Sequence, residues 1–167
     1  MSVSVSVRSY THSVTYVTDN ILRSLKDIVR LSGLDPANLT GAWGTIERGV
    51  RTWIASGHLE RIVLEVYDPQ TNALVNRWDV EISYEWTGGD GEFWTDTEAI
   101  RFAIKKAGVA PGTARYDLIA TLKSGSPDVV GWSTTTLRGT TGMVQQRIGT
   151  TVEGSGLSGG FSYYRRA

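Results

Sequence analysis

The sequence predicts an α+β fold, with amphipathic helices and mostly antiparallel strands in one chain. Apolar residues recur at every third or fourth position in three stretches and at every second position in others, which are the periods of helices and strands. From Lys123 onward the chain is instead rich in Gly, Ser and Thr and is only weakly patterned. At 167 residues, of which 40% are hydrophobic, the chain fits a single domain over 1–167.

The longest helical pattern spans residues 10–32. Its apolar stripe is formed by Val14, Val17, Ile21, Leu25, Ile28 and Leu31. Gly33 follows, and we expect it to end this helix in the left-handed conformation that glycine tolerates. Before the helix, Ser and Val alternate over residues 2–7, and this period of two predicts a short strand.

Two more helices are predicted further along. The first covers residues 40–56, although Gly44 and Gly49 lie within it. Its apolar residues at helical spacing are Trp43, Ile46, Val50, Trp53 and Ile54. The second helix begins at Thr95, because Thr95 and Glu98 have the spacing of a capping box.

A β-hairpin is predicted between these two helices. Residues 62–67 and 74–86 each alternate apolar and polar side chains, and the turn residues 68–72 separate them. The side of the second strand predicted to face water carries Arg77, Asp79, Glu81, Ser83 and Glu85. Residues 116–122 alternate in the same way and predict another strand.

The last stretch of the chain, residues 123–167, starts with the linker sequence SGSPD at 124–128. Its scattered apolar residues are enough for two or three strands but too few for a core of their own. We therefore expect this stretch to lie across the rest of the domain.

The composition argues against several classes of partner and location. Lys plus Arg and Asp plus Glu each number 17, so the formal net charge of zero gives no general reason to expect direct nucleic-acid or membrane binding. The chain has no Cys, which excludes disulfides and thiolate chemistry. No apolar run approaches the ~18 residues of a membrane span, and no export signal is recognisable, so we expect a cytoplasmic protein.

Motifs for catalysis are weak. Residues 156–160 match G-x-S-x-G around Ser158, but a nucleophile elbow needs a helix after the serine, and none is predicted there. His12 and His58 are the only histidines, and no metal-ligand spacing links them. We therefore expect no catalytic residue, no metal and no cofactor.

An acidic loop supports an alternative function. Glu85, Asp90 and Glu92 lie near Trp86 and Trp94, and carboxylate pairs beside aromatic rings are typical of carbohydrate-active sites. Acidic residues are also common in glycine-rich turns and at helix starts, where they need no catalytic role. A small hydrolase or carbohydrate-active module is thus the alternative, and mutation of the three carboxylates would discriminate it.

The order of the predicted elements resembles that of a HORMA domain, and three segments look like the bacterial branch of that family. These segments are SYTHSVTYV at 9–17, LERIVLEVYD at 59–68 and GWS at 131–133. The resemblance implies three helices packed on one face of a mostly antiparallel sheet. It also implies a core over 1–122 and a β-rich C-terminal safety belt over 123–167.

In the HORMA family the safety belt wraps around a bound peptide, called the closure motif. The resemblance implies that such a peptide, from a partner or from the tail of another HORMA protein, adds to the edge strand through main-chain hydrogen bonds. The implied peptide-binding residues are Arg115, Tyr116, Asp117, Leu118, Ile119, Ala120, Thr121, Leu122 and Trp132.

Bacterial HORMA proteins work beside a cyclic-oligonucleotide synthase (CD-NTase) in anti-phage signalling of the CBASS type. The resemblance therefore implies a non-enzymatic switch and adaptor whose peptide-bound form binds and activates the synthase, and an AAA+ ATPase that reopens it. The implied handle for this remodeller is Ser2, Val3, Ser4, Val5, Ser6 and Val7. A purely structural subunit of a larger assembly is the third interpretation.

Overall fold

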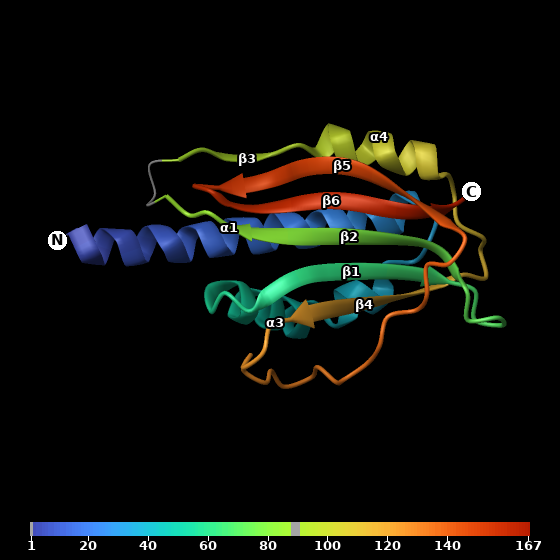
Figure 1. Cartoon of the computed structure of the whole chain (residues 1–167), viewed down its shortest axis with the longest axis horizontal. Helices are drawn as coiled ribbons and strands as arrows, with labels where there is room; N and C mark the ends of the chain where they lie inside the picture. The colour runs from blue at the N-terminus through green and yellow to red at the C-terminus, as the bar shows by residue number, and fades with distance from the viewer. Residues whose placement is uncertain (1, 88–90) are drawn as a thin grey trace.

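The computed structural model describes residues 2–87 and 91–167, with side chains described from Tyr10 onward. The described residues form four helices and six strands (Figure 1), in the order α1 (Ser2–Leu31), α2 (Ala37–Gly41), α3 (Trp43–Ala55), β1 (Leu59–Tyr67), β2 (Leu74–Tyr84), β3 (Phe93–Thr95), α4 (Thr97–Ala107), β4 (Arg115–Leu122), β5 (Met143–Gly154) and β6 (Leu157–Arg166). All pairs of neighbouring strands among the described residues are antiparallel, and the sheet order is β3-β5-β6-β2-β1-β4. The predicted α+β fold is confirmed.

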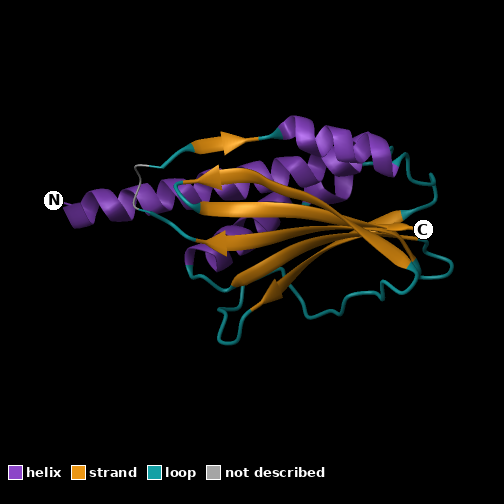
Figure 2. Ribbon diagram, turned by 45° about the horizontal axis from the view of Figure 1, so that its top comes forward, coloured by secondary structure: helices purple, strands orange, loops and turns teal. Residues whose placement is uncertain are grey.

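Helices α1, α3 and α4 cover one face of this sheet, as Figure 2 shows. α1 runs across the middle of the face against β5 and β6, α3 lies beside it towards β1, and α4 lies beside it towards β5. The apolar stripe of each helix is buried against the apolar side of the sheet. Side chains fully buried between the two layers include Val17, Ile21, Ile28, Ile54, Ile62, Trp78 and Phe161.

The first helix starts earlier than predicted. α1 begins at Ser2, so the predicted strand over residues 2–7 is wrong. A strand needs a partner strand to satisfy its backbone, whereas a helix that already exists gains one hydrogen bond for each residue added. At its other end the prediction is confirmed, because Gly33 has a φ of +86° just after the last turn.

The cap of helix α4 lies one residue later than predicted, at Asp96 and not at Thr95, and the helix itself begins at Thr97. The carboxylate of Asp96, and not the hydroxyl of Thr95, accepts the backbone N–H of Ala99 at 3.1 Å. Thr95 is held instead in β3, where it pairs with Val152 and its hydroxyl lies 3.0 Å from that of Tyr16. Strand pairing with a distant segment thus displaced the cap by one position.

On the side of β2 that faces away from the helices, only one end is exposed to solvent. Glu81 and Ser83 are exposed as predicted, but Arg77 and Asp79 are buried, which contradicts the prediction. β1 and β6 flank β2, and a side chain from each contacts this pair: Arg61 of β1 donates to Asp79, and Tyr164 of β6 lies against Arg77. Arg77 makes two hydrogen bonds to Asp79, at 2.7 and 2.8 Å, and Tyr164 covers its guanidinium at 5.0 Å. The pair is therefore buried with its charges compensated.

The C-terminal residues form a hairpin that pairs with β2, far from β4 in the sheet order. Two strands, β5 and β6, form in this stretch, within the predicted two or three. The chain must therefore pass from one edge of the sheet to its other half between β4 and β5. Residues 123–142, which we call the crossing segment, make this passage without helix or strand. Figure 1 shows the crossing segment passing outside the β4 edge.

The residues that the structure describes contain neither a membrane-spanning helix nor a metal-binding group of side chains. None of their helices is both long and apolar enough to cross a membrane. Nor do three or more of their His, Asp and Glu side chains group in a way that could hold a metal ion.

Candidate functional site

Strand β4 leaves one side of its backbone available. In the described part of the chain its only strand partner is β1, and no backbone hydrogen bond joins it there to the crossing segment. In an edge strand every second N–H and C=O points away from the sheet and can pair with another strand. Residues 115–122, predicted to bind a peptide, form this strand.

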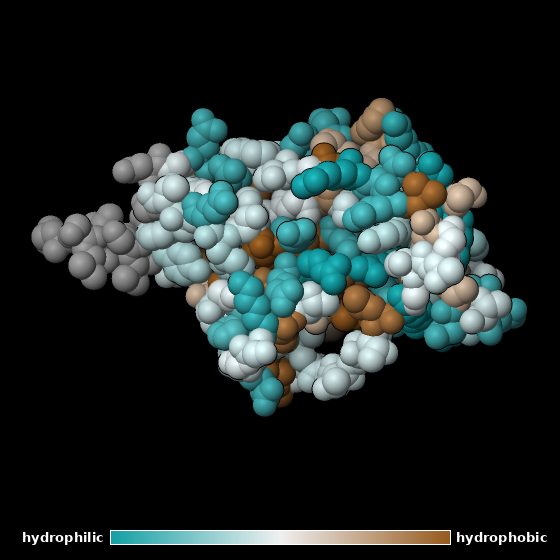
Figure 3. Space-filling model, viewed as in Figure 1, coloured by the Kyte–Doolittle hydropathy of each residue, from teal (hydrophilic) through white to brown (hydrophobic). Residues whose placement is uncertain are grey.

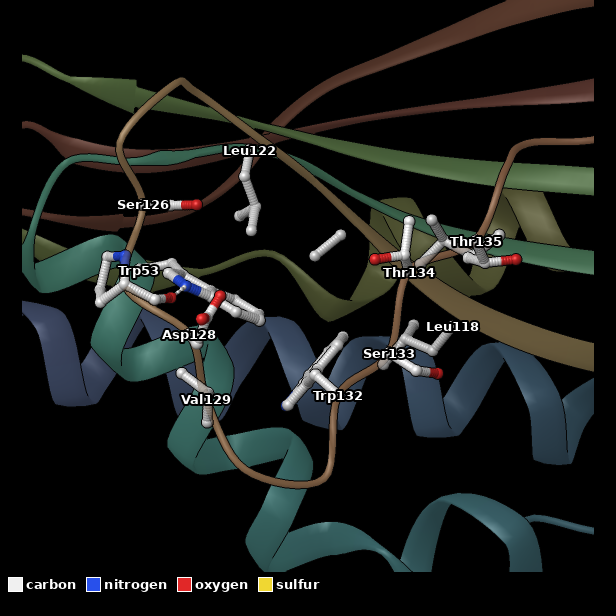
Figure 4. A pocket seen from close by; sticks show the side chains of 13 residues that line it. Trp53, Leu118, Leu122, Ser126, Asp128, Val129, Trp132, Ser133, Thr134 and Thr135 are labelled. Carbon is white, nitrogen blue, oxygen red and sulfur yellow. Dashed lines mark hydrogen bonds between the residues drawn. The ribbon is translucent and has the colours of Figure 1, made fainter.

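The crossing segment is fastened to α3 by two tryptophans, labelled in Figure 4. Trp132 of the crossing segment donates from Nε1 to the carbonyl of Thr45 at 3.0 Å. Trp53 of α3 donates in turn to the carbonyl of Pro127 at 2.7 Å, and the two indoles meet edge to face with centroids 4.9 Å apart. These contacts define the first anchor of the crossing segment, on the helix side of the sheet.

A glycine inside α3 makes room for this anchor. The indole of Trp132 lies so close to Gly49 that a Cβ there would collide with Nε1. By contrast, a Cβ at Gly44 of the same helix would meet no atom within 4 Å. Glycine in a helix interior costs about 0.5–1 kcal/mol relative to alanine, so the close approach of Trp132 explains why Gly49 is present.

The second anchor lies on the opposite face of the sheet and is built on Arg138. Its backbone N–H and its Nη1 donate to the two carboxylate oxygens of Glu65, at 2.7 and 2.6 Å. The same guanidinium donates to Asp117 at 3.1 Å and to Asn72 at 2.9 Å, and it covers the ring of Tyr67 at 3.5 Å. Residues from β1, β4 and the hairpin turn thus hold one side chain of the crossing segment.

At the second anchor, the charges of Glu65 and Arg138 stabilise each other. The Glu65 side chain has an exposed fraction of 0%, although it is charged and its neighbours in β1, Leu64 and Val66, are apolar. Burial by itself would lower the pKa of Arg138, but its hydrogen bonds to Glu65 and Asp117 outweigh that effect and raise the pKa. Arg138 is therefore a permanent cation that neutralises the buried carboxylate.

Between the two anchors the crossing segment and β4 enclose a slot. Two hollows of about 310 and 460 Å³ line up along it, and Leu118, Ile119 and Trp132 are common to both. Figure 3 shows the surface hollowed beside the crossing segment, with hydrophobic residues at the rim. Tyr116 closes the far end: its hydroxyl donates to the carbonyl of Asp35 at 2.6 Å, and burial raises its pKa. The slot is thus an open groove alongside a strand edge, with both apolar and polar residues in its walls.

The remaining predicted site residues lie elsewhere. The residues of the remodeller handle, 2–7, form the first turns of α1, and their side chains are outside the described part of the chain. In the acidic loop, Glu85 and Glu92 are exposed, while Asp90 lies outside the described residues. Ser158 of the G-x-S-x-G match is inside β6, opposite Ser83, without the helix of a nucleophile elbow.

Gly49, Glu65 and Arg138 are among the site residues that were not predicted from the sequence. Two of them did leave a signal: Gly49 interrupts a helical pattern, and Glu65 is a charge between Leu64 and Val66 in an apolar strand. Nothing around Arg138 distinguished it from a solvated loop arginine. Its partners became evident only when the strands were placed side by side.

Comparison with known proteins identifies the fold. A family model described as Bacterial HORMA domain 2 matches residues 2–167. No curated protein matches the chain. Among solved structures, a chain of the Mitotic Checkpoint Complex is similar with a TM-score of 0.71 at 11% identity, covering 95% of this chain and 97% of that one.

Two further structures share this fold. HTP-2 of C. elegans, solved with an HTP-3 closure motif, has a TM-score of 0.61 at 13% identity, and the match covers 92% of this chain and 83% of that one. The E. coli MS115-1 CdnC:HORMA-deltaN complex contains a chain with a TM-score of 0.55 at 12% identity, and the match covers 93% of this chain and 90% of that one. At such low identity these likenesses concern the fold.

Proposed function

The chain belongs to the bacterial HORMA domain 2 family, and from this premise we propose that it is a peptide-operated switch and adaptor without enzymatic activity. Its ligand is an extended peptide, the closure motif, which lies in the slot and pairs with β4. The crossing segment then retains the peptide as the first part of a safety belt over 123–167. The single observation that carries this proposal is the unpaired edge of β4 facing the slot.

The geometry supports capture by strand addition. An added strand lies about 4.8 Å from its neighbour and satisfies the free N–H and C=O groups of the edge. Because the crossing segment is tied to α3 on one side and to the sheet on the other, a peptide in the slot is enclosed by chain. Release of the peptide then requires that at least one anchor opens. The crossing segment thus has a closed position, with both anchors formed, and an open position, with at least one anchor released. These two positions are the two states of the proposed switch.

The proposed partners follow from related assemblies. HTP-2 was solved with closure motifs, and a HORMA chain was solved with CdnC, so a peptide and a cyclic-oligonucleotide synthase are the partners we propose here. The peptide-bound form would bind and activate the synthase in cytoplasmic anti-phage signalling of the CBASS type. An AAA+ ATPase would return the protein to its peptide-free state through residues 2–7.

Selection from a random peptide library displayed on phage, using the purified full chain, tests the proposal. We expect saturable binders, and a synthetic copy of each should slow amide exchange in β4 and in the crossing segment. Copies with one N-methylated amide give the matched control. Because only alternate amides pair with the edge strand, methylation should weaken binding at every second position. Absence of any saturable binder, or protection confined to another surface, would overturn the proposal.

A further inference from the structure

The slot is not uniform along its length, because it consists of two hollows that share part of their walls, including Trp132. The first hollow lies among Trp53, Pro127 and Ala120, and the second lies among Leu39, Ile46 and Tyr116. Leu118 and Trp132 border both hollows. A ligand that follows β4 therefore passes two spaces with a constriction between them.

The β4 side chains that face the helices are Tyr116, Leu118, Ala120 and Leu122, and all four pack against the core. They alternate along the strand because successive residues point to opposite faces. Ala120 is the smallest of them and leaves space in the first hollow, whereas Leu118 lies at the constriction. The helix-facing side chains of a paired peptide must alternate in the same register.

From this register we propose that the slot selects peptides with two apolar side chains four positions apart and a small residue midway between them. One apolar side chain lies opposite Ala120 and fills the first hollow, and the other lies opposite Tyr116 and fills the second. The residue between them faces Leu118 and Trp132, where a large side chain would collide. This inference rests on the proposed function and adds the chemical class of the ligand.

The charged residues around the slot further restrict which peptides can bind. Among the described residues that line the two hollows, the charged ones are Asp117 and Asp128, and both are acidic. Asp117 already accepts a hydrogen bond from Arg138, and Asp128 is exposed at the rim. Because like charges repel and a buried carboxylate needs a partner, acidic residues are excluded from the anchor positions. Neutral ligands, or ligands with basic residues at the ends, fit best.

The other side of the peptide meets a different surface. The crossing segment contributes Ser133, Thr134 and Thr135 to the wall of the slot (Figure 4), so outward-facing peptide side chains lie near polar residues. Hydroxyls donate and accept hydrogen bonds and therefore tolerate many polar residues. Sequence preference should be concentrated in the alternate, helix-facing positions.

The test reads the pattern of residues among binders selected from the phage library on the full chain. We expect two enriched apolar positions separated by four, a small residue midway, and depletion of Asp and Glu at all three. Replacing either apolar residue by alanine in a synthetic binder should weaken binding about 10- to 100-fold, the range that small changes in an apolar pocket produce.

Two matched variants fill one hollow each. Ala120→Leu narrows the first hollow and Ala42→Leu narrows the second, since both alanines line the respective walls. We expect each variant to shift the selected residue at its own anchor position towards smaller side chains and to leave the other position unchanged. An unchanged residue preference at the other anchor position also shows that the variant is folded.

The outcomes separate this inference from the proposed function. If no displayed peptide binds saturably, the proposed function fails. If peptides bind and protect β4, but their apolar residues lie two positions apart, or show no common spacing, the function stands and the two-anchor pattern is overturned. A shift of both positions by one filling variant would likewise overturn the assignment of one hollow to each anchor.

Discussion

Arg138 and Glu65 lie 73 residues apart in the chain and are joined by two hydrogen bonds, of 2.7 Å from the backbone N–H and 2.6 Å from the guanidinium. Glu65 is fully buried in β1, and Arg138 ends the part of the crossing segment that encloses the slot. A buried carboxylate without a cation is costly, so this pair favours the position in which the crossing segment stays closed over β4. Opening of the slot on this side must expose Glu65 to water.

Substitution of Arg138 should therefore loosen the crossing segment. Arg138→Ala removes the guanidinium and leaves Glu65 without it, which should lower the free energy of unfolding by about 3 kcal/mol. Arg138→Lys keeps the charge but loses the forked geometry, and should fall in between. Urea unfolding followed by tryptophan fluorescence measures both. Peptide dissociation should be slowest from the unchanged protein, faster from Arg138→Lys and fastest from Arg138→Ala.

The matched control is Arg101, which has an exposed ion pair with Glu98 at 3.8 Å. Arg101→Ala should change the free energy of unfolding by less than about 1 kcal/mol, as is usual for surface pairs. In a double-mutant cycle, Glu65→Gln should reduce the cost of losing Arg138. Strictly additive effects would contradict a direct coupling between the two side chains.

Gly49 and Gly44 form a second matched pair within α3. Gly49→Ala places a methyl group where the indole of Trp132 lies, so we expect a loss of about 1–3 kcal/mol, as in other overpacked sites. Gly44→Ala meets no neighbouring atom and should be neutral or stabilising by up to about 1 kcal/mol. Chemical unfolding gives both values. Equal stability of the two variants would mean that Trp132 moves aside without cost.

Hydrogen exchange should divide the C-terminal stretch into two parts. Residues 123–142 have no strand or helix, whereas β5 and β6 are paired along most of their length. Without peptide, we expect amides of the crossing segment to exchange faster than those of β6, and peptide binding to slow them. Mass spectrometry of peptic fragments measures the difference. Uniform protection over residues 123–167 with and without peptide would argue against a mobile belt.

Deletion of residues 2–7 tests the proposed handle. Among the described side chains of α1, which start at Tyr10, the first buried ones are Ser13 and Val14, so we expect the truncated protein to keep its core. We expect peptide affinity within about tenfold of the full chain, which is about 1.4 kcal/mol, and loss of reopening by an AAA+ ATPase. Peptide release timed in the presence of ATPase and ATP distinguishes the two effects. Release at the normal rate from the truncated protein would refute the handle.

Local patterns in the sequence determined most elements of this fold. Helices α1, α3 and α4, the β1–β2 hairpin and β4 follow from residues that are near one another in the chain, since periodicity reflects which side of an element is buried. Gly33 ends α1 as predicted because the required backbone conformation is itself local. The peptide-binding strand over residues 115–122 was also placed from sequence, although its role is still a proposal.

Tertiary structure decided which backbone groups and charges find partners. The helical start of α1, the burial of Arg77 and Asp79, the cap at Asp96 and the Arg138–Glu65 pair all depend on segments far away in sequence. No local pattern encodes that β6 lies beside β2, or that the crossing segment turns around β4. Hydrogen bonding and burial are satisfied by whatever lies adjacent in space, so these features are fixed only when the sheet is assembled.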